Sequence, residues 1–179
     1  MEGRRENSEV HWTCWLDQTM RQIDFLVSSP LEPKRHRMAA LFSCRSDIWA
    51  TPRAVVVEWA KRVGPFALDV AASSDNACAP KFYTESDDGL RQSWSVDAGG
   101  EPIWCNPPYS ATNAWVAKAI REHSAGAHIV MLLPSRTDTR WFHALLNEPG
   151  CSLHFLRRRL TFGRAAHPAP FPSLIAVLK

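Results

Sequence analysis

The residues best suited to chemistry in this chain are Asn106–Tyr109 (Asn-Pro-Pro-Tyr), which directly follow the apolar stretch Ile103–Cys105. The apolar stretch predicts a short buried strand, and the two prolines predict a stiff turn at its end. Each proline fixes its φ at about −65° and lacks an N–H donor. We therefore expect the Asn106 side-chain oxygen and the Pro107 carbonyl to form a fixed pair of hydrogen-bond acceptors. Tyr109 adds a flat face on which a ring can stack.

Two fixed acceptors beside a stacking surface suit the transfer of a methyl group to a planar NH2 group. The lone pair of such a nitrogen, as in N6 of adenine, is delocalised into the ring. One acceptor for each N–H draws the nitrogen toward a pyramidal geometry, which is preorganised electrostatics with little need for a strong base. The same four residues could instead form an ordinary turn or a short polyproline segment that binds a partner.

Length and composition indicate a globular protein with one main domain. The chain has 179 residues, 45% hydrophobic content, 22% charged content and a net charge of +3, which permits a local nucleic-acid patch without arguing for one. No apolar stretch approaches the ~20 residues that cross a bilayer, and Met1–Glu6 has no apolar segment behind it, so we expect no signal peptide. The five cysteines form no C-x-x-C motif. We therefore expect reduced thiols, no metal site and a cytoplasmic protein.

The first part of the chain is expected to be a helical extension. Apolar residues at helical spacing over 10–27, including Trp12 and Trp15, predict an amphipathic helix, and residues 30–37 have the composition of a linker. We therefore divide the chain into an extension over 1–37 and a main domain over 38–179. Early in the main domain, Thr51 is expected to cap a helix that has Pro52 at its first position and ends at Gly64.

In the main domain, strands are expected to alternate with helices. The expected strands are 66–72, 103–105, 128–133, 152–156 and 173–178; one helix should be capped by Ser110 or Thr112 and another by Asp138, and residues 73–92 should be irregular. Such alternation predicts an α/β sheet with right-handed crossovers. Ligands of such sheets gather at the carboxyl ends of strands, where both Asp69–Ser73 and Asn106–Tyr109 fall.

A set of short segments, in this order, resembles the phage-type (Dam-like) DNA N6-adenine methyltransferases from about Leu41 to Leu178. The segments are Asp47–Pro52, Leu68–Ser73, Asn76, Asp87–Leu90 with Trp94, Trp104–Ser110, Leu133–Thr139 and Pro170–Ser173. The resemblance implies a Rossmann-like fold that uses S-adenosylmethionine (SAM). It also implies site-specific transfer of a methyl group to N6 of an adenine flipped out of double-stranded DNA, without a metal, in a bacterium or a phage-infected host.

The resemblance also implies roles for individual residues. The catalytic loop would be Asn106, Pro107, Pro108 and Tyr109, and the cofactor-binding residues would be Trp49, Thr51, Pro52, Asp69, Ala71, Ala72, Ser73, Asn76, Asp87 and Asp88. Small residues at 71–73 would let the backbone approach a ligand closely, and an acid at 88 would accept a hydrogen bond from the cofactor's adenine amine. The plainer interpretations are a strand end packed on a helix and a solvated turn.

The chain departs from familiar methyltransferases in four ways. It has no glycine-rich F-x-G-x-G segment, and Arg158-Arg159-Leu160 stands where the family often has Gly-Arg-Leu. Asn106 follows Asp69 by only 37 residues, which predicts abbreviated early strands. Little chain is left for a target-recognition domain, so we expect short or loose recognition of DNA.

Basic residues near the predicted strand ends are candidates for phosphate contacts. Arg136 follows one strand, and Arg158 and Arg159 belong to the densest basic segment of the chain, together with Arg157, Arg164 and His167. Contacts of this kind would offset the cost of flipping an adenine out of a duplex. A plain solvated charge run is the competing interpretation.

Several other functions remain open from the sequence. The substrate could be an RNA adenine or a glutamine amide in a protein, whose NH2 suits the same two acceptors. The chain could also be a degenerate SAM- or DNA-binding module without activity, or an interaction protein that docks through Trp12 and Trp15. Cytosine N4 is disfavoured, because that group of enzymes usually has Ser where Asn106 stands.

Overall fold

The computed structural model describes residues 49–163 and 165–179. The expected helix over 10–27, the linker over 30–37 and the boundary between residues 37 and 38 lie outside the described residues, as does Arg164. Within the described part of the chain, no helix is long and apolar enough to cross a membrane.

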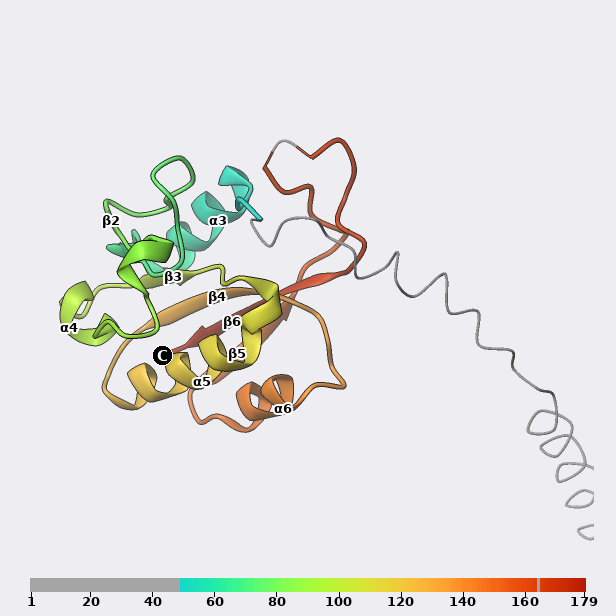
Figure 1. Ribbon diagram of the computed structural model, residues 1–179. Helices are drawn as coiled ribbons and strands as arrows, with labels where there is room; N and C mark the ends of the chain where they lie inside the picture. The colour runs from blue at the N-terminus through green and yellow to red at the C-terminus, as the bar shows by residue number, and fades with distance from the viewer. Residues whose placement is uncertain (1–48, 164) are drawn as a thin grey trace, which may run out of the picture. The chain divides into compact units, whose positions relative to one another are not determined.

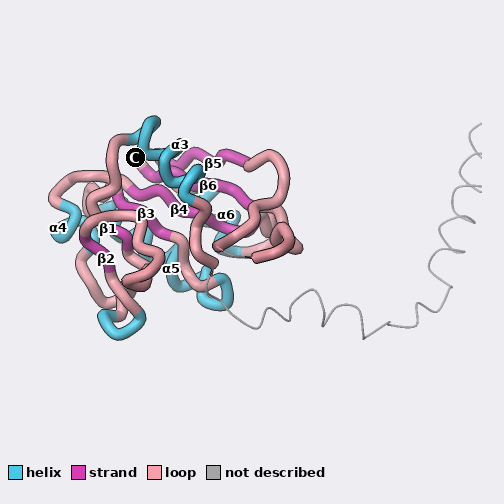
Figure 2. Tube along the Cα trace, turned by 90° about the horizontal axis from the view of Figure 1, so that it is seen from above, coloured by secondary structure: helices cyan, strands magenta, loops and turns pink. Residues whose placement is uncertain are grey.

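A single six-stranded sheet organises the described residues, in the order β2-β1-β3-β4-β6-β5 (Figures 1 and 2). Its strands are β1 (Leu68–Asp69), β2 (Lys81–Phe82), β3 (Ile103–Cys105), β4 (Ile129–Pro134), β5 (Cys151–Phe155) and β6 (Ser173–Leu178). Neighbours from β2 to β4 are parallel, whereas β6 is antiparallel to both β4 and β5. The predicted mixed α/β architecture is confirmed.

The early strands are abbreviated, as the short interval between Asp69 and Asn106 predicts. β1 and β2 have only two residues each. The expected strand over 66–72 is thus too long, because the chain bends at Val70 and Ala71, although the Val70 N–H still donates to the Trp104 carbonyl. β2 falls inside the stretch expected to be irregular, since a pair of residues gives no readable alternation.

Helices cover both faces of the sheet. On one face lie α4 (Trp94–Ala98), α5 (Thr112–Ser124) and α6 (Arg140–Asn147), and on the other lies α3 (Arg53–Val63) (Figure 1). Side chains of β3 alternate accordingly: Ile103 and Cys105 join the core under α5, while Trp104 joins the core under α3. All six residues of β4 are buried, which explains its continuous apolar sequence.

Helix ends were predicted better than helix starts. Gly64, with φ of 102°, follows α3, and Gly126, with φ of 92°, follows the last turn of α5. These are the left-handed conformations that glycine adopts most readily. α4 was missed, because a helix of five residues carries too little pattern.

The predicted N-caps were wrong at each of the three helices. α3 starts at Arg53 after Pro52, α5 starts at Thr112 after Ala111, and α6 starts at Arg140 after Thr139. No side chain caps any of these helices. The hydroxyl groups are engaged elsewhere: that of Thr112 donates to the Tyr109 carbonyl at 2.9 Å, and that of Thr139 donates to the Arg136 carbonyl at 2.7 Å.

Candidate active site

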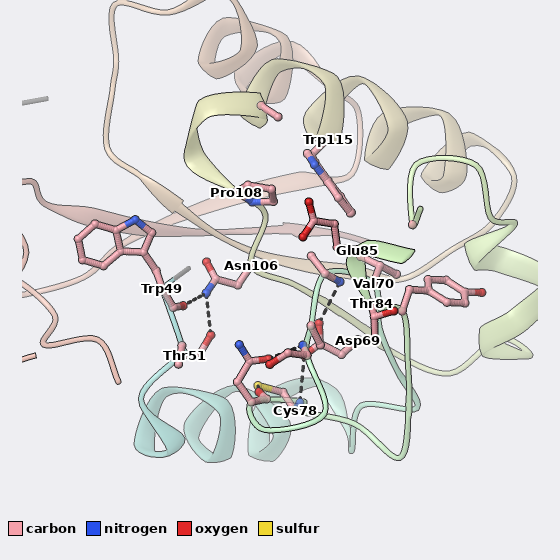
Figure 3. A pocket seen from close by; sticks show the side chains of 18 of the residues that line it. Trp49, Thr51, Asp69, Val70, Cys78, Thr84, Glu85, Asn106, Pro108 and Trp115 are labelled. Carbon is pink, nitrogen blue, oxygen red and sulfur yellow. Dashed lines mark hydrogen bonds between the residues drawn. The ribbon is translucent and has the colours of Figure 1, made fainter. Parts of the chain in front are cut away.

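A cavity opens where the direction of the sheet reverses. The chain steps from β1 outward to β2, and then returns to build β3 and β4 on the other side of β1. The carboxyl ends of β1 and β3 therefore border a topological switch point, which is the usual ligand position in open α/β sheets. The cavity there has a volume of about 970 Å³ (Figure 3). Pockets of this size hold drug-sized molecules and cofactors.

The lining comes from the segment before α3, the loops after β1 and β2, the turn after β3 and the first part of α5. It consists of Trp49, Ala50, Thr51, Asp69, Val70, Ala71, Ala72, Ser73, Asn76, Cys78, Tyr83, Thr84, Glu85, Ser86, Asp88, Gly89, Asn106, Pro108, Ser110, Ala111 and Trp115. Most of the site residues expected from the sequence are brought together here.

The amide of Asn106 is held with its nitrogen toward the protein. Nδ2 donates to the Trp49 carbonyl at 2.5 Å and to Thr51 Oγ1 at 3.0 Å. Oδ1 is buried and has no hydrogen-bond partner among the described residues, and Figure 3 shows it turned away from the two acceptors. A buried acceptor without a partner costs free energy, so it marks a position that a donor on a ligand would complete.

The rest of the Asn-Pro-Pro-Tyr turn is divided between cavity and core. Pro108 lines the cavity and Pro107 is buried. The Pro108 carbonyl accepts the Ala111 N–H at 3.0 Å, whereas no donor among the described residues bonds to the Pro107 carbonyl. The turn therefore has two acceptors, on adjacent residues, to which no described residue donates.

Tyr109 lies behind the cavity rather than in its lining. Its ring stacks on Trp49 at 6.2 Å between centroids and 19° between planes, and packs edge-on against Phe171 at 5.4 Å and Phe162 at 6.3 Å. Its hydroxyl is buried without a partner among the described residues, and burial raises the pKa of Tyr109. We refer to Trp49, Tyr109, Phe162 and Phe171 as the aromatic cluster.

Asp69 holds the loop that follows β1. Its two carboxylate oxygens accept the N–H groups of Ala71 at 3.2 Å and Cys78 at 3.0 Å. Asn76 then closes the loop by accepting the Ser73 N–H on Oδ1 at 2.7 Å. Burial raises the pKa of Asp69 to about 6, against the lowering effect of the two N–H donors. Asp69 and Asn76 thus line the cavity and also shape its wall.

Two neighbouring acids, both expected to contact the cofactor, are separated by the structure. Asp88 lines the cavity in a left-handed conformation, with φ of 49°. Asp87 does not line it; its carboxylate accepts the N–H and hydroxyl of Thr84 at 2.8 and 2.6 Å and caps the short helix η1 (Glu85–Asp87). These hydrogen bonds lower the pKa of Asp87.

Glu85 was missed in the sequence, although its side chain points into the cavity (Figure 3). It stands three residues after β2, and a strand of two residues gave no signal from which to place it. Together, Asp69, Glu85 and Asp88 are the charged residues of the lining, and no basic side chain is found among the described residues that form it. The cavity is therefore negatively charged in a chain of positive net charge.

The part of the cavity wall between the loop after β1 and α5 depends on a glycine. A Cβ on Gly89 would lie 2.3 Å from the Val70 carbonyl oxygen and 3.0 Å from the Trp115 ring. Only glycine permits this approach of backbone to backbone. Trp115, on α5, belongs to the buried core and is also part of the lining.

The remaining expected site residues lie outside the lining. Pro52 precedes α3, and Thr51, which was expected to cap this helix, instead accepts the hydrogen bond from Asn106. Arg136 is half-buried just after β4, while Arg158 and Arg159 are exposed after β5. Phe155 of β5 and Pro134 of β4 pair with the adjacent residues Leu174 and Ser173 of β6, so the carboxyl ends of β4 and β5 lie at one edge of the sheet.

The cysteines near the cavity are not suited to act as nucleophiles, and the described residues there provide no metal site. Burial, with a smaller effect of Asp69, raises the pKa of Cys78 to about 12, and burial raises that of Cys105 as well. Both thiols therefore stay protonated at neutral pH. No group of three metal-ligating side chains is close enough to hold an ion within the residues that the structure describes.

The described geometry agrees with what sequence comparison finds. Residues 39–169 match the model of the family described as DNA N-6-adenine-methyltransferase (Dam). The chain belongs to the Dam family. Among curated relatives, it is 38% identical over 96 residues to the DNA N-6-adenine-methyltransferase of Escherichia phage T1, across 54% of this chain and 39% of that protein.

A second Dam relative gives a longer and weaker match. The DNA N-6-adenine-methyltransferase of Haemophilus phage HP1 (strain HP1c1) is 29% identical over 119 residues, across 65% of this chain and 66% of that protein. The chain thus spans less than two thirds of the length of the curated relatives it matches. The family resemblance inferred from the ordered segments is confirmed.

Proposed function

We propose that this chain transfers a methyl group from SAM to N6 of an adenine in DNA. The observation that carries the proposal is the Asn106 amide, whose nitrogen is held by two protein acceptors while its oxygen is buried without a partner in the described structure. An acceptor in this state matches one N–H of a planar amine. The two Dam relatives carry the name of this activity.

The residues of the cavity fit SAM by their charge and shape. SAM supplies a methyl group on a positively charged sulfonium, and its amino acid part adds an ammonium and a carboxylate, which gives a net positive charge. Asp69, Glu85 and Asp88 provide a negative lining for such a ligand. The loop after β1 and Gly89 bring backbone to the cavity wall without bulky side chains. We further infer that the sheet is the Rossmann-like fold of SAM-dependent methyltransferases.

The catalytic contribution of this chain would come from two acceptors. Asn106 Oδ1 and the Pro107 carbonyl would each accept one N–H of the adenine amine and draw its lone pair out of the ring. Because neither atom has a protein partner among the described residues, no hydrogen bond within the turn must break when the amine arrives. Preorganised acceptors of this kind lower the barrier without a strong base.

Tyr109 is the proposed stacking surface for the flipped base. Its ring already carries a nearly parallel indole from Trp49. An adenine on the same face must therefore displace this indole, and an adenine on the opposite face must open the contacts of the aromatic cluster. The first route would require movement of the segment before α3, and the second would require movement of Phe162 and Phe171.

DNA would approach along the edge of the sheet at which β3, β4 and β5 end. This edge carries Asn106, Arg136 and the exposed Arg157–Arg159. The loop over residues 156–172 is tied to the site, because Gly163 donates to the Ala50 carbonyl at 2.9 Å and Phe162 and Phe171 belong to the aromatic cluster. We propose that Arg136, Arg158 and Arg159 contact phosphates of the flipped strand.

The test is transfer of isotopically labelled methyl from SAM to unmethylated duplex DNA, followed by mass spectrometry of the digested nucleosides. We expect N6-methyl-2′-deoxyadenosine from the wild type and none from the Asn106→Ala variant. Parallel reactions contain RNA of the same sequence and a bacterial protein extract. Label found only in RNA, or only in glutamine side chains, would mean that RNA or protein, and not DNA, is the substrate. SAM binding without transfer to any of them would indicate a binding module.

A further inference from the structure

We infer that Thr51 is a positioning residue, whose hydroxyl helps to hold the Asn106 amide in place. Thr51 Oγ1 accepts a hydrogen bond from Asn106 Nδ2 at 3.0 Å, across 55 residues of sequence. The Trp49 carbonyl accepts the second N–H of the same nitrogen. For its part in catalysis, this inference rests on the proposed function.

The two ends of an amide side chain have nearly the same shape, so hydrogen bonds decide which end faces a ligand. In a reversed amide, Oδ1 would face the Trp49 carbonyl oxygen, which cannot donate, whereas the Thr51 hydroxyl can donate as well as accept. The Trp49 carbonyl therefore selects the orientation in which Oδ1 remains an acceptor, and Thr51 Oγ1 holds the nitrogen in that orientation by accepting its other N–H. That is the orientation in which Asn106 can accept a hydrogen bond from an amine.

Thr51 is free for this role because it does not cap α3. The residue before the helix is Pro52, and its carbonyl accepts the Val55 N–H at 2.9 Å. Proline at this position holds the backbone extended, with φ of −60° and ψ of 127°, and the preceding Thr51 then lies beside Asn106 (Figure 3). The Thr51 hydroxyl therefore holds the Asn106 amide instead of capping α3.

The activity arm compares Thr51→Val with Thr51→Ser. Valine keeps the shape of threonine and removes the acceptor, whereas serine keeps the acceptor. We expect Thr51→Val to lower kcat for DNA about 10- to 100-fold, with the Kd for SAM within about threefold of the wild type, and Thr51→Ser to restore most of kcat. Ser124→Ala, which removes a hydroxyl bonded to the Ile120 carbonyl on α5, is the control with unchanged activity.

A second arm needs neither SAM nor DNA. In ¹⁵N-labelled protein, the side-chain NH2 signals of Asn106 are identified by their loss in Asn106→Ala. We expect these protons to be protected from exchange in the wild type and in Thr51→Ser, and to exchange about 10-fold faster in Thr51→Val, because one of the two acceptors is gone. This arm decides the inference even if the wild type methylates no DNA.

Three results would overturn the inference. Wild-type kcat and wild-type exchange in Thr51→Val would mean that the Trp49 carbonyl suffices. Equal losses in Thr51→Ser and Thr51→Val would mean that the methyl group, and not the hydroxyl, matters. A weakened Kd for SAM with unchanged kcat and exchange would make Thr51 a cofactor contact.

Discussion

The two loops that border the cavity differ in whether their polar side chains have hydrogen-bond partners within the chain. In the loop after β1, Asp69 accepts two backbone N–H groups and Asn76 accepts a third. In the turn after β3, Asn106 Oδ1 and the Tyr109 hydroxyl are buried without partners among the described residues. The polar groups of the first loop thus have partners within the chain, whereas the second loop keeps buried groups that a ligand could complete.

The sharpest test of this contrast is the Asn106→Ala variant, read for both activity and stability. Activity should fall by roughly 10²- to 10³-fold, as for the loss of a preorganised polar group. The free energy of unfolding should change by less than about 1 kcal/mol, because the lost hydrogen bonds are offset by removal of a buried acceptor without a partner. Urea unfolding and methyl transfer measure the two quantities.

Asn113→Ala is the matched control for this variant, since Asn113 is exposed on α5. Its activity and stability should both stay near wild-type values. A loss of several kcal/mol in Asn106→Ala would remove the distinction, because Asn106 would then support the fold as Asp69 does.

The next effect is a pH dependence that originates in the first loop. The pKa of Asp69 is raised in the folded state, from 3.8 to about 6, by burial. The folded state therefore binds more protons than the unfolded state between these values, and stability falls as pH rises through this window. Relative to Asp69→Asn, which does not titrate, the wild type should lose about 2 kcal/mol from pH 4 to pH 6 and level off above about pH 7.

Urea unfolding at a series of pH values measures that difference. A wild-type stability that rises relative to Asp69→Asn across the same window would mean that the two N–H donors outweigh burial. The pKa would then be lowered in the folded state, with the opposite sign of the slope.

A smaller effect is expected at Gly89, where the first loop meets α5. In Gly89→Ala, the added Cβ would lie 2.3 Å from the Val70 carbonyl oxygen, so the wall must shift. We expect a loss of about 2 kcal/mol in the free energy of unfolding and weaker SAM binding by calorimetry. Gly99→Ala has open space but a φ of 61°, so its cost should be about 1 kcal/mol, with unchanged SAM binding. Equal SAM binding in all three proteins would show that the cofactor does not use this wall.

The smallest effect should be that of Tyr109→Phe. The Tyr109 hydroxyl has no partner in the described structure, so its removal should change stability by less than about 0.5 kcal/mol and methyl transfer by less than about threefold. Tyr109→Leu, which removes the ring, should impair transfer much more. A large loss in Tyr109→Phe would reveal a hydrogen bond from this hydroxyl to the substrate.

The sequence carried the local features of the site well. Apolar runs fixed β3 and β6 to the residue, and placed β4 within one residue at each end. The Asn-Pro-Pro-Tyr turn was expected after a buried strand, which is where it lies. These features depend on neighbouring residues, so a linear pattern contains them.

Long-range features were out of reach. Thr51 has the composition and position of an N-cap, yet its partner is Asn106. Asp87 and Asp88 are adjacent and chemically alike, but a capping hydrogen bond turns one away from the cavity. Glu85 follows a strand of two residues. The partner of Thr51 lies 55 residues away, so no local pattern encodes that contact. The hydrogen bond between Thr84 and Asp87 spans only three residues and belongs to a capping box that went unrecognised in the sequence.

The loop over residues 156–172 combines a fixed anchor with a free surface. Phe162 and Phe171 fasten it to Trp49, while Arg157–Arg159 between β5 and the anchor are exposed. Substitutions among these arginines leave the anchor untouched and carry little risk to the fold. New preferences for a partner could therefore be selected one residue at a time on this loop, without rebuilding the reaction centre beside it.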